Sequence, residues 1–248
     1  MKYALVTGAG SGIGRACALG LINDGWTVAL LGRRLEALQA TAALAGEAAS
    51  RALPVSCDVG SEEQVIKAFD TVRQQFGRLD LLFNNAGMGL PPNTPDAISG
   101  ADWRRVVDAN LHGSFYCLSQ AFKIMKTQTP MGGRIVNNGS ISAYAPRPGS
   151  IAYTATKHAV TGLTRTAALD GRPFDIAVGQ IDIGNAASEM TARMTEGVPQ
   201  ADGSVRPEPR MDLSAVVDTL LNMARLPLSA NVLFTTVMAT KMPFVGRG

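Results

Sequence analysis

The sequence predicts one α/β domain with a doubly wound parallel sheet of about seven strands and helices on both faces. Short apolar runs alternate with stretches of helical periodicity along all 248 residues. No Pro-, Gly- or Ser-rich linker divides the chain, which favours a single domain over 1–248. Hydrophobic residues make up 46% of the sequence and charged residues 17%, so the chain can bury a large core.

Each apolar run bounded by turn-forming residues is a predicted strand. These runs are residues 3–6, 27–31, 53–56, 79–83, 133–137, 176–181 and 232–237. Apolar residues at helical spacing over 13–22 follow the first strand, and helices are expected between most of the others. Because ligands bind beyond the carboxyl ends of the strands in such sheets, we expect a site in the loops that follow them.

Charge and cysteine content exclude several classes of protein. The 23 basic residues are scattered and give a net charge of only +3, which argues against nucleic-acid or membrane-surface partners. The chain has neither a run of about 18 apolar residues nor a secretory signal pattern. Cys17, Cys57 and Cys117 lack the spacing of a disulfide framework or a zinc site. We therefore expect a cytoplasmic protein with no metal and with cysteines that serve packing.

Residues 6–14, VTGAGSGIG, form a glycine-rich loop between the first strand and the first helix. In this context backbone N–H groups and a helix N-terminus can receive a pyrophosphate. The spacing Thr7-Gly8-x-x-x-Gly12-x-Gly14, with Gly10 as an extra glycine, implies a wider turn than G-x-G-x-x-G. A plain turn uses glycines in the same way, but the position after the first strand favours a dinucleotide site.

Tyr153 and Lys157 stand at helical spacing in YTATK, so a helix beginning near Ser150 places both on one face. An ammonium group close to a phenol stabilises the phenolate, which makes Tyr153 a candidate general acid or base. Many surface helices carry this pair by chance. Ser140, which follows the apolar strand at 133–137, adds a hydroxyl that can hydrogen-bond a carbonyl oxygen.

Taken in order, these motifs resemble the short-chain dehydrogenase/reductase family over nearly the whole chain. The matches are the glycine loop at Thr7, Gly8, Gly12 and Gly14, the pair Asp58 and Val59, the N-N-A-G segment at Asn84, Asn85, Ala86 and Gly87, and a catalytic tetrad at Asn110, Ser140, Tyr153 and Lys157. The resemblance implies a Rossmann fold and an enzyme that transfers a hydride between nicotinamide and a small carbonyl or alcohol substrate.

The resemblance also implies a role for each residue of the tetrad. Tyr153 handles the proton of the substrate oxygen, and Ser140 steadies that oxygen. Lys157 supports Tyr153 and bonds the nicotinamide ribose, while Asn110 holds a water that connects Lys157 to solvent. His112 and His158 do not belong to this pattern, and both are expected on a helix surface or at an interface. The implied cofactor contacts are Thr7, Gly8, Ser11, Gly12, Ile13, Gly14, Arg33, Arg34, Asp58, Val59, Asn85, Ala86, Gly87, Tyr153, Lys157, Gly184 and Ser188.

Two segments depart from the family pattern. IGNAAS, residues 183–188, has Ile183 in place of Pro and Ser188 in place of Thr, while Gly184 is kept. Ser188 retains a hydroxyl that can bond the nicotinamide carboxamide. The tail at 238–248 replaces the glycine-ended finish common in the family, and it either packs across a subunit boundary or frays.

The stretch LLGRRLEAL, residues 30–38, indicates which cofactor is preferred. An NAD site usually has an Asp or Glu at the end of the second strand, which accepts from the ribose 2′-OH and repels a 2′-phosphate. Here Arg33 stands in that place, with Arg34 beside it, and a guanidinium can form charge-assisted hydrogen bonds with the phosphate. NADP(H) is therefore predicted. NAD(H) is the alternative if both arginines are merely solvated, and Ser11, where many NADP-dependent relatives are basic, favours that alternative.

The loop at 88–95 and the segment at 189–210 are expected to rim the substrate pocket, with 189–210 acting as a mobile lid. Its wall is expected to include apolar side chains of Met88, Leu90, Met190 and Met194. Arg147 and Arg193 either meet an acidic group or are solvated.

The family resemblance implies a homo-oligomer, a tetramer paired through helices at 110–126 and 153–169. A non-catalytic dinucleotide-binding sensor is the rival function, since fold alone does not establish activity. Such a sensor has little need for Asn110, Ser140, Tyr153 and Lys157 together, so their presence favours an enzyme.

Overall fold

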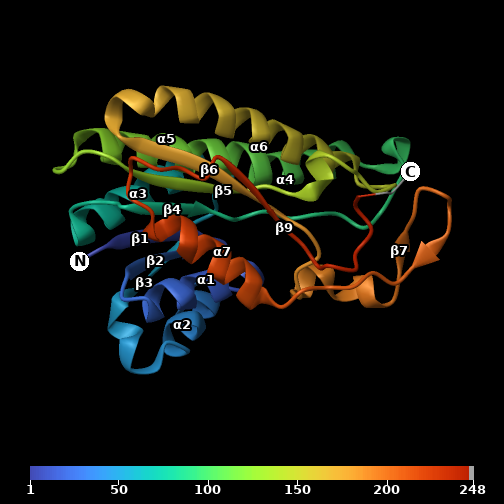
Figure 1. The fold of residues 1–248 in the computed structure, drawn as a ribbon, viewed down its shortest axis with the longest axis horizontal. Helices are drawn as coiled ribbons and strands as arrows, with labels where there is room; N and C mark the ends of the chain where they lie inside the picture. Colours follow the sequence, from blue (N-terminus) through green and yellow to red (C-terminus); the bar gives the residue numbers. More distant parts are fainter. Residues whose placement is uncertain (246–248) are drawn as a thin grey trace.

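A seven-stranded parallel sheet forms the centre of the computed structural model, which describes residues 1–245 (Figure 1). The strand order is β3-β2-β1-β4-β5-β6-β9, so the order reverses between β1 and β4. The strands are β1 (Tyr3–Thr7), β2 (Thr27–Gly32), β3 (Ala52–Ser56), β4 (Leu81–Asn84), β5 (Gly133–Asn138), β6 (Ile176–Ile183) and β9 (Phe234–Val237). This arrangement confirms the predicted doubly wound fold.

Helices cover both faces of the sheet (Figure 1). One face carries α1 (Gly12–Asn23), α2 (Leu35–Ala43) and α7 (Leu213–Arg225), whose buried side chains share one apolar cluster. The other carries α3 (Glu62–Phe76), α5 (Gly113–Thr127) and α6 (Ile151–Asp170), while α4 (Gly100–Val107) packs against α6. Strands buried on both sides are mostly apolar, which is why the runs could be found in the sequence.

All seven predicted strands are present, although some boundaries differ. The strand predicted at 79–83 begins only at Leu81, because the Leu79 amide donates to the side chain of Gln128 rather than to a neighbouring strand. The strand predicted at 176–181 continues to Ile183, since β9 pairs with it as far as Val237. The strand predicted from residue 232 begins at Phe234.

The segment at 189–210 contains a short 3-10 helix, Glu189–Thr195, and a small antiparallel hairpin of β7 (Val198–Pro199) and β8 (Val205–Arg206). After β9 the tail returns to its own subunit, where Ala239 and Met242 are buried against Ile141. The last three residues of the predicted tail, 246–248, lie outside the described residues.

Cys17, Cys57 and Cys117 are free and buried, as expected of packing residues. Across residues 1–245, no helix combines the length and the apolar character that crossing a membrane requires.

Candidate active site

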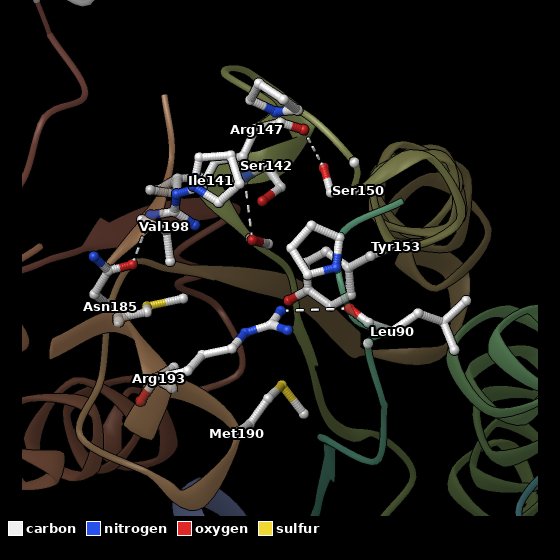
Figure 2. Close-up of a pocket in the computed structure, with 18 of the residues that line it drawn as sticks. Leu90, Ile141, Ser142, Arg147, Ser150, Tyr153, Asn185, Met190, Arg193 and Val198 are labelled. Carbon is white, nitrogen blue, oxygen red and sulfur yellow. Dashed lines mark hydrogen bonds between the residues drawn. The ribbon is translucent and has the colours of Figure 1, made fainter. Parts of the chain in front are cut away.

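A pocket opens at the carboxyl ends of the strands, between the loop after β5, the start of α6 and the segment after β6 (Figure 2). Ser140 and Tyr153 both line it, as do Gly184 and Asn185 from the turn after β6. Leu90, Met190 and Met194 line it as expected, but Met88 does not. The backbone of Met88 instead exchanges two hydrogen bonds with the side chain of Asn110.

Helix α6 supplies Tyr153 and Lys157 from consecutive turns. Ser150 occupies the N-cap position, close to the predicted start. The Lys157 side chain is buried, with 5% of the residue exposed, and its Nζ lies 5.5 Å from the centre of the Tyr153 ring. Nζ also donates to the backbone oxygen of Asn138 at 2.7 Å. The ammonium group is thus held next to the phenol, where it can stabilise a phenolate.

Ser140 follows β5 and caps a short helical turn, Ile141–Ala143. Its Oγ accepts from the amide of Ser142 at 3.1 Å, which leaves the hydroxyl hydrogen to donate to a carbonyl oxygen in the pocket. The Ser140 amide donates to Oδ1 of Asp182 at 3.0 Å. Together the two hydrogen bonds hold residues 140–142 in place, so that the Ser140 side chain lines the pocket.

Asn110 lies in a π-helical turn, Asp108–His112, that joins α4 to α5. Such turns interrupt the regular helix and often mark functional positions. Asn110 is 2% exposed, and its Nδ2 donates to the oxygen of Met88 at 2.9 Å and to Oγ1 of Thr156 at 3.1 Å. Thr156 precedes Lys157, so Asn110 joins the loop after β4 to the helix that carries the lysine.

The glycine loop closes tightly between β1 and α1. Gly8 and Gly12 have φ values of +68° and +51°, and a Cβ on Gly14 would lie 2.1 Å from the oxygen of Gly8. Gly10, the extra glycine, lies against α2, where a Cβ would come within 3.1 Å of Ala37. The loop is therefore built for close backbone approach, which only glycine permits.

The N-terminus of α1 fits a phosphate. The first N–H groups of a helix have no partner within it. Ser11 makes no side-chain cap here, and the first turn contains no acidic residue. Ile13 packs against the core from this turn. The chemistry of these donors suits the pyrophosphate of a dinucleotide.

The N-N-A-G segment is tied to the glycine loop by hydrogen bonds. Oγ1 of Thr7 accepts from the amides of Asn85 at 2.9 Å and Ala86 at 2.8 Å, and Nδ2 of Asn85 donates to the oxygen of Thr7. A Cβ on Gly87 would lie 3.1 Å from Oδ1 of Asn110. The N-N-A-G segment therefore contacts Thr7, where the glycine loop begins, at one end and Asn110 at the other.

Arg33 and Arg34 are exposed where β2 ends and α2 begins. Within residues 1–245 neither guanidinium forms an ion pair. Asp58 follows the neighbouring strand β3, and its Oδ1 accepts from the amide of Gly60 at 3.0 Å. Val59 is buried against Gly113 of α5 and acts as a packing residue. Two unpaired cations therefore lie beside the turn that contains Asp58.

The unusual turn after β6 is supported by the tail. Ile183 ends the strand, and a Cβ on Gly184 would lie 2.7 Å from both Cβ of Met238 and Sδ of Met242. Ser188 lies next to the glycine loop, since a Cβ on Gly12 would come within 3.3 Å of it. The predicted pair of Gly184 and Ser188 thus meets the pocket and the glycine loop respectively.

His112 and His158 are both exposed on helical segments, as expected. His112 pairs with Asp108 within the π-helical turn, and Nδ1 of His158 lies 2.9 Å from the oxygen of Thr154. Neither lines the pocket.

Sequence reasoning missed a buried polar chain beneath Ser140. Asp182 is 0% exposed, and its carboxylate accepts from the Ser140 amide, from Gln180 Nε2 at 2.7 Å and from the Tyr144 hydroxyl at 2.9 Å. Burial and the bond to Asp182 raise the pKa of Tyr144. A Cβ on Gly139 would lie 2.1 Å from Asp182 Oδ1, so the backbone just before Ser140 packs directly against this carboxylate. The signal was available, because Gln180 and Asp182 interrupt an apolar strand.

The second missed feature joins the segment at 189–210 to the pocket. Glu208 has 1% of its side chain exposed, and its Oε2 lies 2.5 Å from Nη2 of Arg147. Asn185 and Gln200 also donate to its carboxylate, at 2.8 and 3.0 Å. Burial acts to raise the pKa of Glu208, but the bonds from Arg147, Gln200 and Asn185 outweigh it and lower the pKa to about 2. Glu208 is thus ionised at neutral pH, and the stabilisation that its lowered pKa contributes is lost progressively as pH falls from about 4.5, the ordinary pKa of a glutamate, to about 2.

Comparison with known proteins places this geometry among oxidoreductases. A family model described as short chain dehydrogenase matches residues 2–199. The 3beta-hydroxysteroid dehydrogenase of Mediterraneibacter gnavus is 36% identical over 197 residues, which cover 79% of this chain and 70% of the relative. Sulfoacetaldehyde reductase 2 of Chromohalobacter salexigens is 33% identical over 240 residues, covering 96% of this chain and 94% of the relative.

Among solved structures, the 3-ketoacyl-(acyl-carrier-protein) reductase of Brucella melitensis complexed with NADH superposes with a TM-score of 0.85. The match covers 97% of this chain and 98% of the reductase at 24% sequence identity. At that identity the likeness concerns the fold.

Proposed function

The chain belongs to the short-chain dehydrogenase family of oxidoreductases, which act on alcohol and ketone groups, and on that premise we propose an NADP(H)-dependent enzyme for small carbonyl and alcohol substrates. One observation supports the chemistry above all others. Tyr153 and Ser140 line the same pocket, and the buried Nζ of Lys157 lies 5.5 Å from the Tyr153 ring. The proposed site therefore holds a proton donor, a hydrogen-bond donor and a fixed cation together.

In the reductive direction, a substrate carbonyl oxygen lies between the hydroxyls of Tyr153 and Ser140. A bound reduced nicotinamide dinucleotide would supply the hydride to the carbonyl carbon, and the oxidised cofactor would accept it in the reverse reaction. Tyr153 donates its proton to the substrate oxygen as negative charge develops there, and the Lys157 ammonium stabilises the phenolate that remains. Ser140 donates a hydrogen bond to the same oxygen. The Asn110 side chain bonds both the backbone of Met88 and the hydroxyl of Thr156. It thereby fixes the helical turn that carries Lys157 against the loop that contains Met88.

The cofactor would lie across the carboxyl ends of β1, β2 and β4. The N-terminus of α1 suits its pyrophosphate, and Arg33, with Arg34 as second candidate, suits a ribose 2′-phosphate. Gly184 lines the pocket and Ser188 lies beside Gly12 of the glycine loop, which supports their expected contacts with the nicotinamide end of the cofactor. NAD(H) is the alternative cofactor, and it applies if the two exposed arginines make no contact with the adenosine ribose.

A panel of ketones, keto acids and alcohols assayed with NADPH, NADH, NADP and NAD tests this function. We expect turnover with at least one small carbonyl compound and a higher kcat/KM with NADPH than with NADH. Absence of turnover across a broad panel, with cofactor binding intact, would favour the non-catalytic sensor instead.

We expect a cytoplasmic protein, because a reducing compartment suits its three free thiols. We also expect it to form a homotetramer through α5 and α6. A groove between these helices is lined by apolar side chains that include Phe115, Phe122, Leu163 and Phe174. Phe115 is 49% exposed on the single chain, a costly position for a large apolar ring. Light scattering at micromolar concentration should show the tetramer, and a monomer would contradict this expectation.

We expect residues 189–210 to act as a lid that Glu208, near its C-terminal end, anchors through its ion pair with Arg147. Hydrogen exchange should be fast in the lid of the free enzyme and slower with cofactor and substrate bound. Glu208→Gln removes the charge that pairs with Arg147 and should speed exchange in the lid while leaving β6 protected. If the lid amides of the free enzyme are as protected as those of β6, the lid hypothesis is wrong.

A further inference from the structure

The charges that line the pocket are all positive. Among its lining residues, Arg147 and Arg193 are the charged side chains, and no Asp or Glu is present (Figure 2). The rest of the wall is apolar or carries neutral polar groups. A neutral, wholly apolar substrate would offer no counter-charge to a cation in this lining, whereas an anionic substrate would.

The charge of Arg147 is already neutralised by a protein carboxylate and is therefore not available to a ligand. Its Nη2 lies 2.5 Å from Glu208 Oε2 and also donates to Asn185 Oδ1 at 2.9 Å. Because Glu208 is ionised at neutral pH, the pair is electrically neutral. Arg147 therefore serves to anchor the lid segment.

Arg193 is in a different state. Its Nη2 donates to the backbone oxygen of Leu90 at 3.4 Å, a long hydrogen bond. No ion pair to Arg193 occurs among the residues that the structure describes. Figure 2 shows its side chain reaching from the lid side of the pocket towards Leu90 and Tyr153. A guanidinium has five N–H donors, so most of its hydrogen-bonding capacity is unused.

The surroundings of Arg193 strengthen its attraction for an anion. Met190 and Met194 flank it on the same short helix, and Leu90 and Val198 also line the pocket. Arg193 itself is exposed, so solvent partly screens its charge, but a ligand that fills the pocket would cover the guanidinium and strengthen a charge pair there. A guanidinium fork matches the two oxygens of a carboxylate or sulfonate.

We propose that Arg193 selects substrates that carry an anionic oxyacid group, a carboxylate or a sulfonate, near the reacting carbonyl or alcohol carbon. This inference rests on the proposed function of the same pocket and narrows its substrate class. Tyr153 and Ser140 bind the reacting oxygen, and Arg193 binds the anionic end from the lid. Binding of the anion also ties the lid segment to the substrate.

Matched pairs of substrates test the selection directly. Pyruvate, acetoacetate and levulinate are each compared with their neutral amides, and sulfoacetone is compared with acetone. The wild type should prefer the anion in at least one pair by about tenfold or more in kcat/KM, as expected for a charge-assisted hydrogen bond. Pyruvate, acetoacetate and levulinate differ in the number of carbon atoms between the carboxylate and the keto group. The pair with the largest preference therefore indicates the spacing that the pocket favours.

Variants then assign the preference to one side chain. Arg193→Met should lower kcat/KM for the preferred anion at least about tenfold more than for its neutral partner, mainly through KM. Arg193→Lys should retain part of the preference. Arg206→Met is the matched control, because it removes a cation from the same segment that does not line the pocket. It should leave the preference unchanged.

Three outcomes would overturn the proposal: no anion preferred in any pair, equal losses for both members of a pair in Arg193→Met, or weaker cofactor binding in that variant with the substrate preference intact. The last would assign Arg193 to a cofactor phosphate. Calorimetry on Tyr153→Phe enzyme saturated with cofactor measures the same affinity differences without turnover. A failure of the proposed function, seen as absent catalysis, is thereby separated from a failure of this inference.

Discussion

Tyr153→Phe is expected to lower kcat by roughly a hundredfold to ten-thousandfold, the range typical for loss of a general acid. The substitution deletes the hydroxyl that lines the pocket and retains the ring beside Lys157. Cofactor affinity should remain largely intact. Turnover is measured under saturating cofactor, and the dissociation constant of the cofactor is measured separately by fluorescence.

Tyr3→Phe is the matched control for this variant. Tyr3 stacks on Phe76 at the start of β1, at the end of the strand opposite the glycine loop. Removing its hydroxyl should leave kcat unchanged. Near-native turnover in Tyr153→Phe would remove this residue from the proposed mechanism, whatever the result for the control.

Arg33→Asp is expected to reverse the preference between cofactors. If Arg33 bonds the 2′-phosphate, the variant loses a charge-assisted bond and gains repulsion, which should weaken NADPH relative to NADH by about 2 kcal/mol or more. That difference corresponds to roughly 30-fold in relative kcat/KM and in relative dissociation constant. Both quantities are measured for both cofactors.

Arg34→Asp tests the neighbouring cation in the same way. Arg34 occupies the N-cap position of α2, one residue further along the chain. A smaller change in Arg34→Asp than in Arg33→Asp would assign the phosphate contact to Arg33. A wild-type enzyme that prefers NADH, or an Arg33 variant with unchanged preference, would refute the NADP(H) assignment.

The parts of the fold that the sequence predicted are those governed by local pattern. Strands buried under helices on both faces, such as β1 and β2, are nearly continuous apolar runs. The spacing of Tyr153 and Lys157 indicated one helix face, because side chains one turn apart lie together. The position of Ser140 after a strand placed it at the carboxyl edge of the sheet.

The features that were missed depend on contacts between distant residues. Nothing local to Glu208 indicates that it meets Arg147, since the pair forms only when the segment at 189–210 folds back against the loop after β5. The π-helical turn at Asn110 leaves no mark in apolar periodicity. The apolar side chain of Met88 predicts a place in the pocket wall, but its backbone bonds to the Asn110 side chain instead and the residue does not line the pocket.

Transfer of deuterium from the cofactor tests the central claim most directly. Reduced NADP carrying deuterium at C4 of the nicotinamide is incubated with the enzyme and the best ketone of the panel, and the alcohol is analysed by mass spectrometry. The account predicts deuterium on the carbinol carbon of the alcohol formed by the wild type, and little alcohol of any kind from Tyr153→Phe. Alcohol without deuterium at that carbon, or labelled alcohol formed equally well by Tyr153→Phe, would contradict it.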